Sequence, residues 1–226
     1  ETTWWRAQTL LTKEPETIEW IDGFADGEVY WDVGANIGVY ALYAARRPGV
    51  RVLAFEPSPF NYFALCKNAI LNGLTGRLSS YCMAFNDRTA LDDLHMWTLE
   101  VGGALSNFGE SAGAWGDEFR PRHSLGMTGY ALDDFVERFA PPFPNHLKVD
   151  VDGIEAKIVA GGRRTLADPR LKSVSIELDE KRADELAQVS GLLQQAGLRL
   201  QQRKHSAEVD RSSFASVYNY LFVRDA

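Results

Sequence analysis

The sequence has few of the residues that build disulfide frameworks and zinc sites. Its 226 residues include only 2 cysteines and 4 histidines. Cys66 and Cys82 are too few for a disulfide framework or a Cys/His metal site, so both are excluded. Because both cysteines have apolar neighbours, we expect them to be buried thiols in a reducing cytoplasm.

Long apolar runs and excess positive charge are also missing. No stretch approaches the ~18 apolar residues of a membrane span, and the first residues lack a signal-peptide pattern. We therefore expect a cytoplasmic protein without a membrane partner. Lys and Arg number 24 against 31 Asp and Glu, which gives a net charge of −7. Since nucleic-acid binding needs a basic surface, no nucleic-acid partner is expected.

The chain alternates strand-like and helix-like segments, which is typical of an α/β protein with helices on both faces of a parallel sheet. At this length we expect residues 1–226 to form a single domain with a full core. Residues 1–27 are predicted to be helical. Strands are expected at 30–33, 50–55, 78–85, 146–151 and 173–178, with 90–97 as an added strand and 198–203 and 218–223 as a closing antiparallel pair. Helices are expected at 39–47, 61–71, 155–167 and 184–196.

The segment 102–129 has no clear periodicity and contains seven glycines. Long segments without regular structure inside a compact domain are often binding loops or lids. Because Phe108, Trp115 and Phe119 would be costly to expose, we expect a lid or acceptor loop rather than a solvated excursion.

The most informative motif is a glycine turn followed by an acid. Residues 32–38 read Asp-Val-Gly-Ala-Asn-Ile-Gly and connect a strand to a helix, and Glu56 ends the next strand. Glycine allows φ > 0 and a close approach of a ligand to the backbone. An acid about 20 residues past such a turn can bind ribose hydroxyls at the carboxyl ends of the strands. The motif predicts a nucleoside site.

Two classes of cofactor use this arrangement. Dinucleotide sites usually carry Gly-x-Gly-x-x-Gly, but here the third glycine is missing and Asp32 opens the turn. An acid at this point suits a ligand that carries an ammonium group, so S-adenosylmethionine fits better than NAD. A nicotinamide-dependent oxidoreductase on a similar sheet and a non-catalytic nucleoside-binding domain remain the alternatives.

A second polar motif follows the fourth predicted strand. Residues 148–155 read Lys-Val-Asp-Val-Asp-Gly-Ile-Glu, with three carboxylates close together. Neighbouring carboxylates raise one another's pKa unless a cation intervenes. The group could supply a general base, bind an ammonium group or hold a divalent metal. Alternatively, Asp152 and Glu155 could be acids that only stabilise the N-terminus of the following helix.

The ordered set of motifs resembles the FkbM-type methyltransferases, which are class I S-adenosylmethionine-dependent enzymes. The resemblance rests on residues 32–38, Phe55–Pro59 with Asn61, Leu132–Asp134, Lys148–Glu155 and Asn219–Phe222. It runs from about Trp5 to Arg224. In the second motif, Asp152 stands where the family usually has glutamate. The negative charge is kept, but the side chain is shorter.

The resemblance implies a Rossmann-like, seven-stranded, mostly parallel sheet of order 3-2-1-4-5-7-6. It also implies O-methylation of a hydroxyl on a sugar or a secondary metabolite. No metal-binding residues are assigned, and assistance by a divalent cation stays open. The catalytic candidates are Asp150, Asp152 and, in the loop between the last two strands, His205. The expected cofactor-binding residues are Asp32, Gly34, Ala35, Asn36, Gly38, Glu56, Pro57, Ser58, Phe85 and Asn86.

Overall fold

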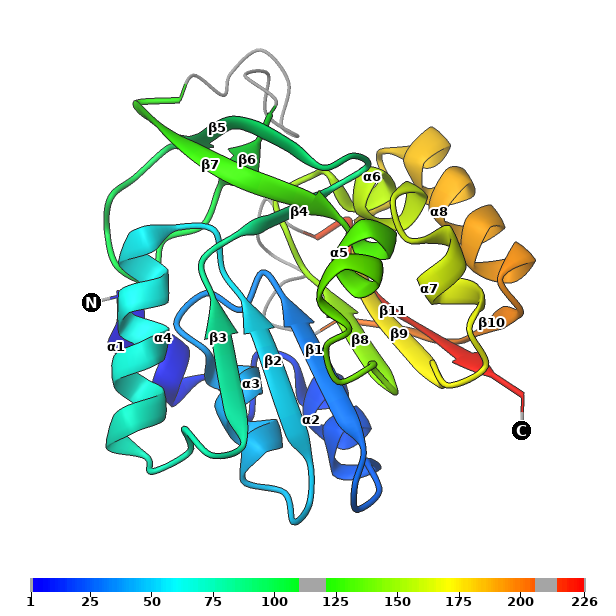
Figure 1. Cartoon of the computed structure of the whole chain (residues 1–226), viewed down its shortest axis with the longest axis horizontal. Coiled ribbons are helices and arrows are strands. Elements are labelled where there is room, and N and C mark those ends of the chain that lie inside the picture. Colours follow the sequence, from blue (N-terminus) through cyan, green and yellow to red (C-terminus); the bar gives the residue numbers. More distant parts are fainter. Residues whose placement is uncertain (1, 110–120, 206–214, 226) are drawn as a thin grey trace.

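The computed structural model describes residues 2–109, 121–205 and 215–225. Its main sheet has seven strands in the order β10-β11-β9-β8-β1-β2-β3 (Figure 1). These strands are β1 (Val29–Val33), β2 (Arg51–Phe55), β3 (Leu78–Tyr81), β8 (His146–Val149), β9 (Ser173–Asp179), β10 (Leu198–Lys204) and β11 (Val217–Arg224). Numbered along the chain within this sheet, they lie in the order 3-2-1-4-5-7-6.

The main sheet is mixed. Strands β3, β2, β1, β8 and β9 are parallel to their neighbours, so their carboxyl ends meet at one edge. Strand β11 is antiparallel to both β9 and β10. The crevice where ligands of open α/β sheets bind lies outside the carboxyl ends of such strands.

Helices cover both faces of the main sheet. They are α1 (Thr2–Gln8), α2 (Pro15–Asp22), α3 (Val39–Ala45), α4 (Pro59–Leu71), α5 (Leu132–Phe139), α6 (Glu155–Ala160), α7 (Arg163–Ala167) and α8 (Ala183–Gln195). Alternate strand residues point to opposite faces. Tyr30 and Val52 belong to a core with α2, α3 and α4, whereas Trp31 and Leu53 belong to a core with α5 to α8. The strands are apolar on both faces because both faces are covered.

One predicted helix is divided in two in the structure. The helix expected at 155–167 is interrupted between α6 and α7 by Gly161 and Gly162. A Cβ atom at Gly161 would lie 2.4 Å from the carbonyl oxygen of Asn86, and one at Gly162 would lie 2.7 Å from Cδ1 of Leu132. The glycines therefore allow close packing against neighbouring segments at the break.

A second sheet was not predicted. Its four strands are β4 (Ala84–Asn86), β5 (Ala90–Met96), β6 (Ser106–Phe108) and β7 (His123–Ala131), in the order β4-β7-β5-β6. The strand expected at 78–85 ends at Tyr81 in the main sheet, and the chain continues as β4 in the second sheet. Figure 1 shows this sheet above the end of the main sheet at which β1, β2 and β3 finish.

The segment 102–129 was thus wrongly predicted to lack regular structure. Its described parts form β6 and β7, and Phe108 is buried in the core that both sheets share. Trp115 and Phe119 lie outside the described residues. The role of the segment as a lid or acceptor loop stays a prediction.

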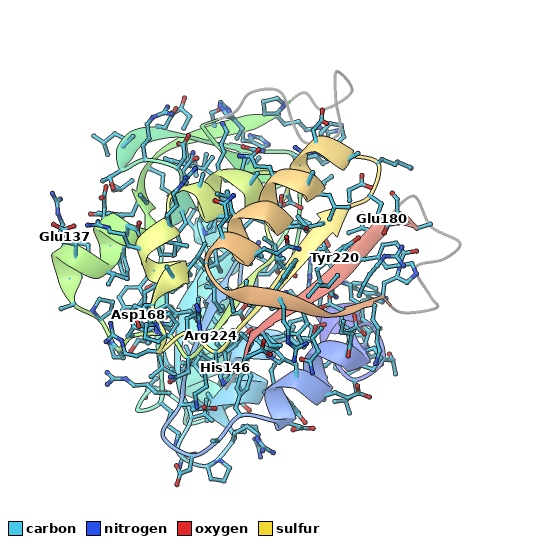
Figure 2. The ribbon with its side chains drawn as sticks, turned by 90° about the vertical axis from the view of Figure 1, so that its right-hand side faces the viewer. Glu137, His146, Asp168, Glu180, Tyr220 and Arg224 are labelled. Atoms are coloured by element: carbon cyan, nitrogen blue, oxygen red, sulfur yellow. The ribbon has the colours of Figure 1, made fainter. Side chains whose placement is uncertain are left out.

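The side chain of Arg224, labelled in Figure 2, holds the end of the last strand, β11, against neighbouring segments. Its guanidinium donates hydrogen bonds to the carbonyl oxygens of Leu166, Leu171 and Ala196 at 2.7–2.9 Å. A single side chain therefore connects the end of β11 to the ends of α7 and α8 and to the segment just before β9.

The prediction that both cysteines are buried is wrong. The side chain of Cys66 is partly buried, but Cys82 is exposed because it lies at the crossing between the two sheets. Among the described residues, no helix combines the length and apolar character needed to cross a membrane.

Candidate functional site

A cavity of about 680 Å³ opens at the carboxyl ends of the parallel strands. Its walls come from five parts of the chain: the α1–α2 region, the turns after β1 and β2, the segment 97–106, the segment after β8, and the ends of β9 and β11. Of the predicted site residues, the lining includes Gly34, Asn36, Glu56, Pro57, Asp150, Asp152 and His205. The size is within the range of small-molecule sites.

The turn after β1 fits closely against the segment after β8. Gly34 has a φ of +85°, and a Cβ atom there would lie 1.8 Å from the carbonyl oxygen of Asp150. Only glycine can occupy this position without moving the backbone. The two predicted motifs are therefore in direct contact.

Replacing Gly34 by alanine is expected to destabilise the protein. A left-handed backbone alone costs a non-glycine residue about 1–2 kcal/mol, and the loss should be larger here because the new methyl group would collide with backbone atoms of Asp150. The free energy of unfolding in urea measures the effect. Gly191→Ala in α8 is the matched control, since a Cβ there has open space; it should stabilise the helix by about 0.5–1 kcal/mol. Equal stabilities of the two variants would contradict this account.

Glu56 connects the ends of β1 and β2. Its two carboxylate oxygens accept hydrogen bonds from the backbone N–H groups of Asn36 (2.7 Å) and Ser58 (2.8 Å). Burial raises the pKa of Glu56 to about 7, although these donors favour the ionised form. A ligand that donates further hydrogen bonds to this carboxylate would stabilise its ionised form.

A short segment before β6 passes over the glycine turn. The carbonyl oxygen of Gly103 accepts hydrogen bonds from the side-chain amides of Asn36 (2.9 Å) and Asn61 (3.0 Å). The N–H of Gly102 donates to Oδ1 of Asn61 at 2.7 Å. The second sheet is thus connected to the nucleoside motif through asparagine side chains.

Asp150 and Asp152 follow β8 but have different environments. Asp150 forms an ion pair with the buried Lys148, which lowers the pKa of Asp150 even though burial opposes ionisation. Asp152 accepts a hydrogen bond at 2.9 Å from the backbone N–H of Ser106, and burial raises its pKa to about 6. Of the two carboxylates, Asp152 is the better suited to accept a proton near neutral pH.

A second group of acids, which we call the carboxylate cluster, consists of Glu14, Asp150 and Glu177. One oxygen from each lies within 4.8 Å of the others. Burial, followed by the charges of Asp150 and Glu14, raises the pKa of Glu177 well above its usual range. Burial would lower the pKa of Lys13, but the surrounding carboxylates raise it.

His205 reaches the cavity from the end of β10. Its Nδ1 lies 3.2 Å from the carbonyl oxygen of Val217, and its ring stacks on Tyr218 with 3.9 Å between centroids. The imidazole is therefore held against β11 at the edge of the cavity, and a catalytic role for it stays a prediction.

Asp32 does not line the cavity, contrary to the expectation that it faces the ligand. It lies opposite Lys148 in the register of β1 and β8, and only 1% of its surface is exposed. Burial raises its pKa to about 6, while Lys148 favours the charged form. The Asp32 side chain is buried beside Lys148 and does not reach the cavity. An ammonium group of a ligand in the cavity would therefore contact other carboxylates.

Five further predicted residues also lie outside the lining, because their contacts serve the fold. Gly38 allows α3 to approach Leu65, and the Ser58 side chain caps α4. The backbone N–H of Ala35 donates to Phe55, and Asn86 donates to the carbonyl oxygen of Phe108. Phe85 is a core residue that borders a small adjoining cavity of about 20 Å³.

Sequence reasoning missed several residues of the cavity. Lys13 and Glu14 lie in the segment predicted to be helical, and Glu177 lies in the strand expected at 173–178, so none of the three was assigned to the site. Glu177 could have been found by the criterion used for Glu56, since it is an acid near the carboxyl end of a parallel strand. The side chains of Arg6 and Arg182 carried no comparable signal, yet both line the cavity.

Residues 32–221 match the methyltransferase FkbM domain. The chain belongs to the FkbM methyltransferase family. A 31-O-demethyl-FK506 methyltransferase, FkbM of Streptomyces tacrolimicus, is 29% identical over 174 residues, which cover 68% of this chain and 66% of the relative. The hexuronic acid methyltransferase AglP of Haloferax volcanii is 24% identical over 172 residues, covering 76% of this chain and 65% of the relative. The match thus spans slightly less than two thirds of each relative's length.

The fold is shared with solved methyltransferases. A SAM-dependent methyltransferase from Aquifex aeolicus aligns with a TM-score of 0.51 at 10% identity, over 97% of this chain and 93% of that one. This likeness supports the class I, Rossmann-like fold. Family membership confirms the resemblance seen in the sequence and, with it, S-adenosylmethionine as the cofactor, and it favours a methyltransferase over a nicotinamide-dependent oxidoreductase.

Proposed function

We propose that the protein transfers a methyl group from S-adenosylmethionine to a hydroxyl of a sugar or a secondary metabolite. The observation that supports the proposal is one cavity whose lining contains both Glu56, the carboxylate proposed to bind the ribose, and Asp152, the carboxylate proposed to accept a proton. The two relatives, one named for 31-O-demethyl-FK506 and the other for a hexuronic acid, support an oxygen acceptor of this kind.

The nucleoside is proposed to lie against the turns after β1 and β2. Glu56 would accept hydrogen bonds from the ribose hydroxyls, and Gly34 lines the cavity at the turn. Asn36 and Asn61 hold the segment at Gly103 over the turn. In this arrangement the cofactor would lie next to Asp150 and Asp152, because the turn at Gly34 touches the segment after β8.

When bound, the cofactor would supply a methyl group on a sulfonium: the acceptor oxygen would attack the methyl carbon in line, and the sulfur would leave as the thioether of S-adenosylhomocysteine. The protein's main task is to align the acceptor with the methyl carbon. Asp152 would take the proton of the acceptor hydroxyl as the new C–O bond forms and the C–S bond breaks. General-base assistance of this kind contributes typically about 10²–10⁴-fold.

Binding of the cofactor product, S-adenosylhomocysteine, is expected to tighten as the pH rises. Because the pKa of Glu56 in the free protein is about 7, a ligand that donates to its carboxylate must displace a proton below that pH. The affinity should therefore increase by up to about tenfold per pH unit below pH 7 and become constant above it. Calorimetric titrations between pH 5.5 and 8.5 measure the slope, and Glu56→Gln should flatten it.

NAD⁺ is the comparison ligand for the same titrations. The proposal requires micromolar binding of S-adenosylhomocysteine, which is about −8 kcal/mol at 1 μM, and much weaker binding of NAD⁺. Tight binding of NAD⁺ with none of S-adenosylhomocysteine would overturn the proposal. A pH-independent affinity would instead remove Glu56 from the ribose site while leaving the cofactor assignment intact.

A further inference from the structure

The carboxylate cluster has the spacing of a cation site. Glu14 precedes α2, Asp150 follows β8 and Glu177 is near the end of β9, yet one oxygen from each lies within 4.8 Å of the others. Hard divalent cations bind carboxylate oxygens at about 2.0–2.6 Å. Two oxygens bound to one ion are therefore at most about 5 Å apart, so a single ion can reach all three residues.

The lysines near the cluster compensate only part of its charge. Lys13 lies 3.0 Å from Glu14, and Lys148 pairs with Asp150. The Glu177 carboxylate has no hydrogen bond or ion pair with any other residue that the structure describes. Across the cavity lining, seven carboxylates face three permanently charged bases: Glu14, Glu56, Asp150, Asp152, Glu155, Glu177 and Asp179 against Arg6, Lys13 and Arg182. Acidic side chains thus outnumber basic ones in the lining of the cavity.

A neutral oxygen next to the cluster provides independent support for a ligand. Asn219 of β11 lies directly opposite Glu177 of β9 in the antiparallel register, so their side chains share one face. Asn219 is 7% exposed and lines the cavity. Its Nδ2 donates to Glu16 at 2.9 Å, which fixes the amide orientation and leaves the buried Oδ1 without a hydrogen-bond partner in the described part of the chain.

We propose that Glu14, Asp150, Glu177 and the Oδ1 atom of Asn219 bind one hard divalent cation, such as Mg²⁺. All four ligands are oxygens, and the cluster contains no histidine or cysteine, which favours Mg²⁺ over Zn²⁺. The cation would bind the Glu177 carboxylate, which has no hydrogen bond or ion pair among the described residues, and the unsatisfied amide oxygen of Asn219. Its role in catalysis rests on the proposed function: it would orient an acceptor hydroxyl and lower the pKa of that hydroxyl.

The site is tested with chelator-treated full-length protein and Mn²⁺ as a spectroscopic probe. Electron paramagnetic resonance is expected to show one bound Mn²⁺ per chain, displaced by Mg²⁺. Glu177→Gln, which keeps the side-chain shape, should weaken Mn²⁺ binding at least tenfold. Asp179→Asn is the matched control, because Asp179 lies on the same strand and lines the same cavity but is outside the cluster; it should retain the wild-type Mn²⁺ affinity.

Thermal unfolding provides a second measurement. Since a ligand of the native state raises the melting temperature, Mg²⁺ should stabilise the wild type and Asp179→Asn but not Glu177→Gln. Absence of Mn²⁺ binding at millimolar concentration would overturn the proposal, and so would equal Mn²⁺ affinities in the two variants. Titration of the same metal-free samples with S-adenosylhomocysteine separates the two proposals: if the protein binds the nucleoside but does not bind Mn²⁺, the cation site alone is refuted.

Discussion

Glu56→Ala is expected to weaken the binding of S-adenosylhomocysteine about a hundredfold. A hydrogen bond to a charged group contributes about 1.5–3 kcal/mol, and the proposed ribose contacts would lose their acceptor. The substitution also removes the link between the backbone N–H groups of Asn36 and Ser58. Isothermal titration calorimetry at pH 8, where the carboxylate of the wild type is ionised, measures the change.

The control for Glu56→Ala is Glu137→Ala, which removes a carboxylate that is 70% exposed and lies outside the cavity lining. This variant should bind the ligand as the wild type does. Circular dichroism establishes that Glu56→Ala is folded under the conditions of the titration. If folded Glu56→Ala kept the wild-type affinity, the ribose would have to bind elsewhere in the cavity.

Asp152→Asn is expected to lower the turnover number by about 10²–10⁴-fold, the usual contribution of a general base. The affinity for the cofactor should change little, because asparagine can still accept the hydrogen bond from the backbone N–H of Ser106. Single-turnover rates at saturating cofactor, with a methyl acceptor found by screening sugars and macrolides, separate the chemical step from binding.

The matched control is Asp184→Asn, an exposed acid in the first turn of α8, which should keep the wild-type rate. A pH–rate profile adds a second readout, since the wild-type rate should fall as the pH drops below about 6, where Asp152 becomes protonated. An Asp152→Asn variant that loses cofactor affinity but keeps its rate at saturation would show that Asp152 serves binding and not proton transfer.

The sequence by itself determined the α/β character, the turn at Gly34 and the acid at Glu56. These features are local: periodicity within one strand or helix reports its type, and a glycine turn followed by an acid depends on about 20 residues of chain. The structure places Gly34, Asn36, Glu56 and Pro57 together in one cavity. The two motifs predicted to form the site also meet, through the approach of Gly34 to Asp150.

Only the tertiary structure decided which way the acids point and which of them meet. Strands that are buried on both faces carry apolar residues at nearly every position, so the sequence could not show that Asp32 faces Lys148 and not the cavity. Strands β5 and β7 pair across a long stretch of chain, and no local pattern revealed their separate sheet. Glu14, Asp150 and Glu177 come together for the same reason: contacts between distant residues depend on the packing of whole elements, which local patterns do not encode.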